Sequence, residues 1–441
     1  MEQRRKNLTQ LFIPICLETL LYMLSGMVDT LMLSSVNDQA VGAVGTANTY
    51  IGIFIIMFSV ISSGMVAVMT QNIGAGRPGV AYQARQLGLA FNAVLGVIMS
   101  LFLSLGAGTI LSGVGVADAL MQPARTYLQI VGGFCILNAL IPICSSYLRA
   151  FGFSKEPLYA SIIGNVINFC LNAFFLFVLH KGVAGVATAT VISRIINLVI
   201  VVLLGAVLVK AKQHPERESN RAVMGQIIRI GLPSACETAI YNVSMTLVIR
   251  FLNQMDAQGL NVTARSYTMQ ITNFSYCVGA ALAQANAIMT GWRIGAKEYD
   301  ACDRGTRKAA IIGVIVAVIL ETMFALCSGW IMQLFSKDPQ MVSLVGKLLA
   351  IDIVLEMGRV TNLVYGQALK TSGDAVFPVV MGACFMILCS VGGTYLFGIR
   401  LGLLAVGAYI GMTGDECVRA VGMYLRWKSG KWKEKGLVKS R

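Results

Sequence analysis

The sequence is poor in charged residues. Of its 441 residues only 13% are Asp, Glu, Lys or Arg, whereas soluble proteins average about 25%. Hydrophobic residues make up 56% of the chain. This balance excludes an ordinary water-soluble globular domain and indicates a protein whose surface faces lipid.

Histidine is nearly absent, and cysteine lacks metal-binding spacing. The chain has 2 His and 11 Cys, with neither a CxxC nor an HExxH motif. Structural metal sites and thiol redox centres need such paired ligands. We therefore expect no metal, no cofactor and no enzyme activity, and we interpret the cysteines as small buried hydrophobic side chains.

Long apolar segments recur along the chain, separated by short polar breaks. A bilayer-spanning helix needs about 20 mainly apolar residues. Twelve segments meet this length, at roughly 11–34, 42–72, 84–112, 123–149, 157–180, 183–210, 224–252, 259–291, 307–334, 341–370, 376–398 and 402–426. The sequence therefore predicts an all-α integral membrane protein of about twelve transmembrane helices.

An internal repeat relates the two halves of the chain. Pro14 and Glu18 recur as Pro233 and Glu237, an offset of 219 (233 − 14). Later pairs keep nearly the same register: Tyr22 with Tyr241, Ser25 with Ser244, Pro157 with Pro378, and Gly182 with Gly402. Six spans in each half give parallel repeats, related by a pseudo-two-fold axis along the membrane normal. The predicted parts are an N-lobe at 1–212, a cytoplasmic linker at 213–223 and a C-lobe at 224–441.

Basic residues alternate between the two sides of the membrane. Both tails and the even-numbered connections carry most of the Lys and Arg, whereas the opposite face has few: Lys181, Lys337 and Arg400. The positive-inside rule then predicts that both termini are cytoplasmic. This bias also accounts for the net charge of +14 without any nucleic-acid partner, and we expect a multi-pass protein of the bacterial inner (plasma) membrane.

Asp29 is the strongest functional candidate, because it is an acid within the first apolar span. Ionisable groups at that depth are costly and usually face a cavity or a partner. One acid that alternates between a proton and another cation could couple ion entry to export. The alternative is a carboxylate held permanently by neighbouring Ser, Thr or Asn donors.

Polar side chains of the fifth and sixth spans could join Asp29. Asn168 and Asn172 are four residues apart and share a helix face, and Thr190 follows in the sixth span. These groups could satisfy one another's hydrogen bonds or present an oxygen-rich cation site. Both options are open from the residues alone.

Further charges lie within the other apolar spans. Glu237 is a candidate for cation or substrate contact, and Glu356 either takes part in such a site or pairs with Arg359, three residues on. Glu18 is equivalent to Glu237 in the repeat and suggests a packing or gating role. Arg194, Glu321, Asp415, Glu416 and Arg419 are further intramembrane charges.

Two prolines, Pro14 and Pro233, fall inside predicted helices. Proline removes one helical hydrogen bond and favours a kink. Such a kink near a titrating acid could be a moving part, or it could serve packing alone.

In order and spacing, these residues resemble the multidrug and toxic compound extrusion (MATE) transporters over nearly the full chain. The motifs that carry the resemblance are Pro14…Glu18…Val28-Asp29-Thr30, Asn72-Ile73-Gly74-Ala75-Gly76-Arg77, Arg149-Ala150-Phe151-Gly152, Asn165…Asn168…Asn172, Gly182 through Thr190, Gly231-Leu232-Pro233-Ser234…Glu237, and Leu355-Glu356…Arg359…Asn362…Ala368.

The resemblance implies a two-lobed helical bundle and secondary active export driven by proton or sodium entry. It implies lipophilic organic cations, drugs or amphiphilic metabolites as small-molecule substrates, and we expect a monomer in the lipid bilayer. It makes Asp29 the coupling acid and places Pro14 at a bend linked to its protonation.

The resemblance also implies two cation sites, and in each site one residue differs from the one that family members have. The first would use Asn168, Asn172 and Thr190, but Asn172 stands where family members have an Asp. Losing that carboxylate weakens the case for sodium and favours proton coupling at Asp29. The second would use Glu237 and Glu356, where a Glu replaces the family's Asp in the tenth span.

Three rival functions remain. A flippase for a lipid-linked precursor would need a strongly cationic cavity, and intramembrane Arg is sparse here. A membrane-embedded enzyme would need a metal or nucleophile cluster, and a channel would need repeated polar rings. The two-half design favours a carrier over both.

Overall fold

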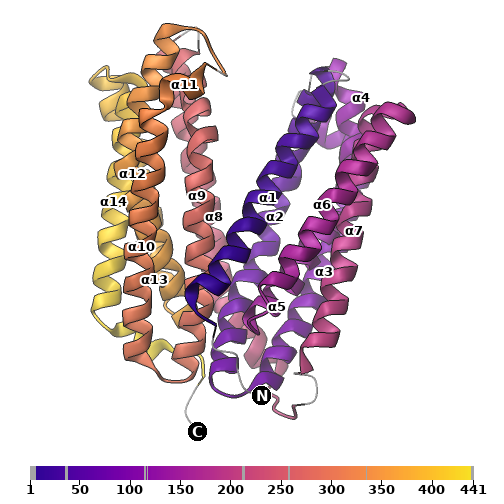
Figure 1. Ribbon diagram of the computed structural model, residues 1–441, viewed down its shortest axis with the longest axis vertical. Coiled ribbons are helices and arrows are strands. Elements are labelled where there is room, and N and C mark those ends of the chain that lie inside the picture. Colours follow the sequence, from indigo (N-terminus) through magenta and orange to yellow (C-terminus); the bar gives the residue numbers. More distant parts are fainter. Residues whose placement is uncertain are drawn as a thin grey trace. The chain divides into compact units, whose positions relative to one another are not determined.

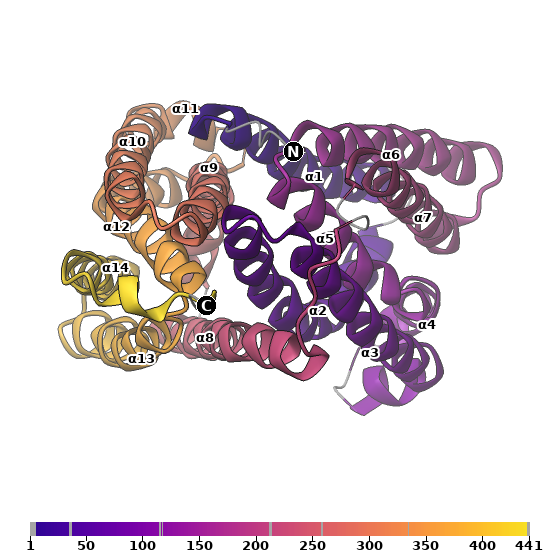
Figure 2. The ribbon, with the colours of Figure 1, turned by 90° about the horizontal axis from the view of Figure 1, so that it is seen from below.

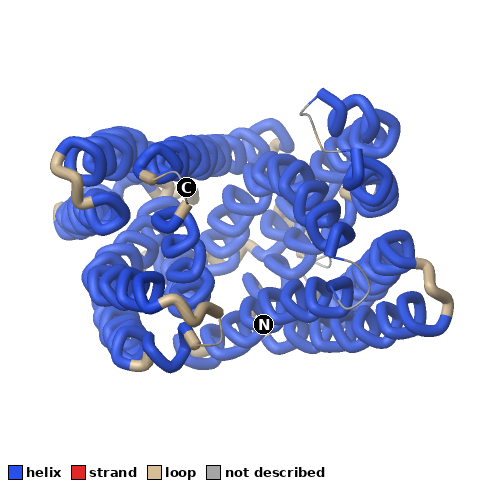
Figure 3. Tube along the Cα trace, turned by 90° about the horizontal axis from the view of Figure 1, so that it is seen from above, coloured by secondary structure: helices blue, strands red, loops and turns tan. Residues whose placement is uncertain are grey.

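The computed structural model describes residues 6–34, 38–113, 116, 118–210, 214–256, 259–333 and 335–438. Over these ranges the chain is almost wholly helical and contains no strand, as Figure 3 shows. Contacts divide it into a first unit, residues 1–232, and a second unit, residues 233–441. The prediction of an all-α fold is confirmed.

The first unit consists of long helices joined by short connections. They are α1 (Leu8–Ser34), α2 (Asp38–Gly74), α3 (Pro78–Gly113), α4 (Asp118–Tyr127), α5 (Ile136–Ala150), α6 (Lys155–Ala173), α7 (Gly182–Leu208) and the start of α8 (Asn220–Met255). Two π-helical segments, Leu128–Gly132 and Phe174–Val178, continue α4 and α6. Helix α6 packs against both α1 and α7 (Figure 2), which brings together the spans that carry Asp29, Asn168 and Thr190.

The second unit has the rest of α8 and a set of helices around α12. They are α9 (Leu260–Gly295), α10 (Tyr299–Leu326), α11 (Ser328–Met332), α12 (Pro339–Ser372), α13 (Val376–Phe385) and α14 (Leu404–Lys428), with π-helical segments Met386–Val391 and Thr394–Arg400 and a short 3₁₀-helix, Lys431–Lys435. Helix α12 packs against α9, α10 and α14, which run alongside it in Figure 1.

Seven helices of the described chain are long and apolar enough to cross a membrane, or eight if a bent pair counts as one span. Four more are long enough but more polar: α8 and α9 (36 residues each), α12 (34) and α14 (25). At about 1.5 Å per residue, 25 residues already exceed the ~30 Å of a bilayer's hydrocarbon core. The eight apolar spans and these four helices together give the expected twelve. Polar residues of the four helices line a cleft.

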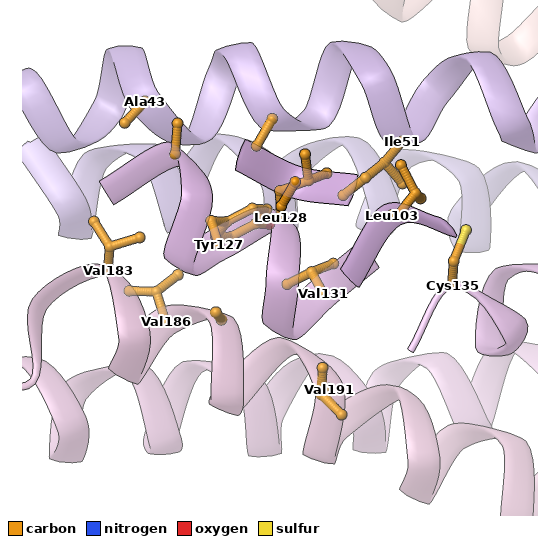
Figure 4. Close-up of a cluster of buried hydrophobic side chains, with 14 of the residues drawn as sticks. Ala43, Ile51, Leu103, Tyr127, Leu128, Val131, Cys135, Val183, Val186 and Val191 are labelled. Carbon is orange, nitrogen blue, oxygen red and sulfur yellow. The ribbon is translucent and has the colours of Figure 1, made fainter. Parts of the chain in front are cut away.

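One predicted span, 123–149, is not a single helix. It is broken into 120–132 and 136–150, with a bend of 43°. Gly132 and Gly133 are adjacent at the break, and consecutive glycines weaken a helix because they lack side chains and have high backbone freedom. Figure 4 shows Tyr127, Leu128 and Val131 of the first segment packed into the buried core of the first unit.

Two close backbone contacts join the start of α8, residues 220–232, to α2 within the first unit. A Cβ atom on Gly64 of α2 would collide with the Ile227 carbonyl of α8, and one on Gly231 of α8 would collide with the Val60 carbonyl of α2. Glycine is needed at such contacts because the two backbones touch. The boundary between the units therefore falls inside α8, after the linker expected at 213–223, and the division into 1–212 and 224–441 stays a prediction.

Candidate functional site

Asp29 meets the two asparagines that the sequence pairs with it. The Asn172 amide nitrogen donates to Asp29 Oδ1 at 2.7 Å and lies 3.2 Å from Asn168 Oδ1. Asn172 is fully buried, Asn168 is 5% exposed and Asp29 is half-buried. The carboxylate of α1 is thus joined to α6 by one direct hydrogen bond.

The hydroxyl of Thr190 bonds to its own helix and not to the group around Asp29. It is buried in α7, but its hydroxyl donates to the Val186 carbonyl of its own helix at 2.9 Å. No hydrogen bond within the described chain joins it to Asp29, Asn168 or Asn172. Its hydroxyl oxygen keeps free lone pairs, so its role as a ligand stays a prediction.

Arg194 supplies positive charge near this acid. It lies one turn beyond Thr190 in α7 and acts electrostatically on Asp29. The phenol of Tyr127, on the bent span, is coupled to both Arg194 and Asp29. Asp29 therefore sits between an amide donor and a guanidinium, where adding a proton removes a favourable charge interaction.

Pro14 lies within α1, and the helix continues through it from Leu8 to Ser34. Its side chain is buried. The hinge role of Pro14 stays a prediction.

Glu18 is held by a cation rather than left free. Arg149 Nη2 of α5 lies 2.6 Å from Glu18 Oε2, and the Ser161 hydroxyl of α6 lies 3.4 Å from the other oxygen. This charge-assisted pair ties α1 to α5 and supports a packing role for Glu18.

The second unit contains a cleft of about 390 Å³ lined by α8, α9, α12 and α14. Its walls mix charged groups with tyrosines and methionines. Four basic and three acidic side chains contribute: Arg265, Arg359, Lys370 and Arg419, with Glu237, Asp352 and Glu416. Such a concave site, with a few placed charges among apolar walls, is typical of a small-molecule binding site.

The two acids expected to form a second cation site have different partners. Glu237 Oε2 lies 2.6 Å from Lys370 Nζ, and Glu356 Oε2 lies 2.8 Å from Arg359 Nη1. The predicted tenth span ends at Lys370, whereas α12 continues to Ser372, and the Lys370 side chain reaches Glu237. The shared cation site of Glu237 and Glu356 stays a prediction.

A chain of ion pairs continues from Glu356 to α14. Arg359 Nε lies 3.6 Å from Glu416 Oε1, and Arg419 Nη2 lies 2.9 Å from the same oxygen. Arg419 also pairs with Asp415 at 2.8 Å. Buried pairs of this kind need every partner, because losing one leaves an unpaired charge.

Sequence reasoning missed Asp352, which lines the cleft. It is 2% exposed, and its Oδ2 atom has no hydrogen-bond partner among the described residues. The sequence spacing could have identified it, because Asp352 precedes Glu356 by four residues and so shares its helix face. Glu321 of α10 is fully buried and electrostatically coupled to both.

Among the described residues, no three His, Cys, Asp or Glu side chains gather closely enough to hold a metal ion. Asp29, Glu237, Glu356 and Glu416 instead pair with Asn, Lys or Arg side chains. Paired charges and polar side chains of this kind can bind a small molecule through hydrogen bonds and ion pairs.

The long apolar helices, the buried intramembrane charges and the polar cleft define a multi-pass membrane transporter. A family model described as MatE matches residues 14–174 and again 233–396, and the chain belongs to this family, the MATE transporters. The two matches begin 219 positions apart (233 − 14), which is the offset of the internal repeat.

Relatives and solved structures agree over nearly the whole chain. The protein named "Uncharacterized transporter YisQ" of Bacillus subtilis (strain 168) is 33% identical over 96% of this chain and 94% of its own length. "Probable multidrug resistance protein NorM" of Thermotoga maritima is 23% identical over 98% and 94%. A crystal structure of MATE in the straight conformation has a TM-score of 0.88 at 19% identity, covering 97% and 96% of the two chains.

Proposed function

We propose that this protein is a proton-coupled exporter of amphiphilic organic molecules, including lipophilic cations, in a bacterial plasma membrane. Proton entry through Asp29 would drive substrate outward by alternating access. The protein would act as a monomer with both termini in the cytoplasm. The multidrug-resistance names of its relatives support the substrate class, and the distribution of basic residues supports the orientation.

The observation that carries the proposal is the 2.7 Å hydrogen bond between Asn172 and Asp29. An amide nitrogen faces the carboxylate where a second carboxylate would be needed for a tight sodium site. One acid surrounded by neutral amides and a nearby Arg194 can exchange a proton. It offers few of the oxygen ligands that a hard metal cation requires.

The proposed coupling follows from these contacts. When Asp29 is ionised, Asn172 and the positive charge of Arg194 hold α1 against α6 and α7. Protonation removes the charge, so both attractions weaken and α1 is free to repack, with Pro14 as its flexible point. Substrate release would accompany that repacking.

A flippase for a lipid-linked precursor is the less favoured alternative. It would need an excess of cations to hold a pyrophosphate group. The cleft of the second unit has four basic and three acidic side chains, and three of its cations are committed to ion pairs.

Ethidium uptake into inside-out proteoliposomes tests the proposal, with a proton gradient and a sodium gradient imposed separately. We expect uptake with the proton gradient alone, near-complete loss in Asp29→Asn and partial retention in Asp29→Glu. Asp338→Asn is the matched control, because Asp338 is exposed at the start of α12 and Asn can still accept its hydrogen bond from Gln340. A folded Asp29→Asn protein that transports at the parental rate would refute coupling through Asp29.

A further inference from the structure

Arg265 is a buried cation that has no ion-pair partner in the part of the chain that the structure describes. It lies in α9, is 7% exposed and lines the cleft of the second unit. Its Nη2 atom donates to Met245 Sδ at 3.7 Å, and its Nε atom has no partner among the residues that the structure describes. A sulfur atom is only a weak acceptor, so neither Nε nor Nη2 of the guanidinium has a strong acceptor among the described residues.

The other three cations of the cleft differ from Arg265 in this respect. Lys370 pairs with Glu237 at 2.6 Å, Arg359 with Glu356 at 2.8 Å, and Arg419 with Asp415 at 2.8 Å. Within the described chain no carboxylate lies within ion-pair distance of Arg265. Burying a charge without a partner is costly, and ionisable residues inside membrane spans usually mark a substrate or ion pathway.

The surroundings of Arg265 suit the apolar part of a ligand. Met245, Met269, Met412 and Tyr409 line the same cleft. Methionine side chains adapt to ligands of varied shape, and tyrosine offers a flat apolar face with a polar edge. The cleft thus joins one unpaired guanidinium to adaptable apolar walls.

From this geometry we infer that the cleft of the second unit binds amphiphiles that carry a carboxylate, with Arg265 as the group that recognises the anion. The planar guanidinium matches a carboxylate in a two-point hydrogen bond. The inference rests on the proposed function for the export step, but the binding step stands on this cleft alone.

The test compares two dyes that differ at one group: rhodamine 110, which has a free carboxylate, and rhodamine 123, its methyl ester. Binding to the full-length detergent-purified protein is measured by fluorescence anisotropy without any ion gradient. In Arg265→Gln we expect the Kd of rhodamine 110 to rise about tenfold or more, the usual size for a lost charge-assisted hydrogen bond. The Kd of rhodamine 123 should change less than twofold.

Two further variants separate recognition from structure. Arg265→Lys keeps the charge but loses the two-point geometry, so rhodamine 110 should bind with intermediate affinity. Arg250→Gln, at an exposed arginine of α8, is the matched control and should bind both dyes like the parent.

Three results would overturn the inference: no binding of rhodamine 110 by the parent protein, no change in Arg265→Gln, or equal weakening of both dyes, which would make Arg265 a structural residue. Failure of the proposed function has a separate signature. In that case rhodamine 110 would bind in an Arg265-dependent way, yet neither gradient would drive transport.

Discussion

Glu237 Oε2 lies 2.6 Å from Lys370 Nζ, and the internal repeat gives this pair a counterpart in the first unit. Glu18 is equivalent to Glu237 at an offset of 219 (237 − 18), and its partner Arg149 precedes Lys370 by nearly the same interval, 221 (370 − 149). Each half thus holds the acid of its first long helix with a basic side chain from a later one. This parallel favours a structural tie at both positions.

If the pair is structural, Lys370→Met alone should destabilise the protein more than the double variant Lys370→Met/Glu237→Gln. The paired side chains are only 14% and 15% exposed, so removing one leaves a poorly hydrated charge. We expect a loss of about 3 kcal/mol in the free energy of unfolding for Lys370→Met and recovery of most of it in the double variant. Circular dichroism of unfolding in mixed micelles measures the free energies of this double-mutant cycle.

The control for this cycle is Lys337→Met, at an exposed lysine just before α12. It should change the free energy of unfolding little, because surface charges contribute little. If Lys370→Met were as stable as the parent, Glu237 would be free to take a cation, as the family resemblance implies.

Part of the candidate site can be predicted from the sequence, and part cannot. The meeting of Asp29, Asn168 and Asn172 follows from helix periodicity and the resemblance, because side chains four residues apart share a face. Arg265 escapes sequence reasoning for a tertiary reason. Nothing in the order of residues shows that it lacks a carboxylate partner, since the partners of the other cleft cations come from distant helices or neighbouring turns.

The end of the tenth span gives a second example. The sequence predicts that the tenth span ends at Lys370, whose charge belongs to the cytoplasmic side by the positive-inside rule. In the structure α12 continues and the side chain reaches back to Glu237. A long lysine stem allows such a reach, with its apolar part buried and its head on a partner.

Asn172→Asp should make transport dependent on sodium. The new carboxylate would replace the amide that lies 2.7 Å from Asp29 Oδ1. Two carboxylates at this separation repel each other, and a cation between them relieves the repulsion. In alkaline medium without sodium we expect ethidium transport to fall roughly tenfold, a typical size for coupling between sites, and added sodium should restore it.

Asn165→Asp is the matched control for this prediction, because it makes the same chemical change two turns earlier in α6. Its transport should show no response to sodium. If Asn172→Asp were equally indifferent to sodium, the oxygen atoms around Asp29 would be too few or badly placed for a metal cation, and proton coupling would gain support.

The C-terminal segment, residues 429–438, should detach from the rest of the protein in acid. The carboxylate of Asp374, in the turn between α12 and α13, accepts hydrogen bonds from Arg426 Nε and Lys435 Nζ, both at 2.7 Å. Burial by itself raises the pKa of this carboxyl, but the two cations outweigh it and hold the pKa below its ordinary value. Its stabilisation is therefore present above the ordinary pKa of about 3.9 and is lost as pH falls through the lowered pKa.

Tryptophan fluorescence can follow this detachment. Trp432, next to the Lys435 anchor, is 1% exposed and stacks on Trp427 with ring centroids 4.1 Å apart. Asp374→Asn should raise acrylamide quenching of the tryptophans at pH 7, with a loss of about 2 kcal/mol in docking free energy. The parent should reach that quenching only below about pH 4. Asp300→Asn, at an exposed acid in the first turn of α10, is the control, and equal quenching of all three proteins across the titration would mean that Trp427 and Trp432 hold the segment without Asp374.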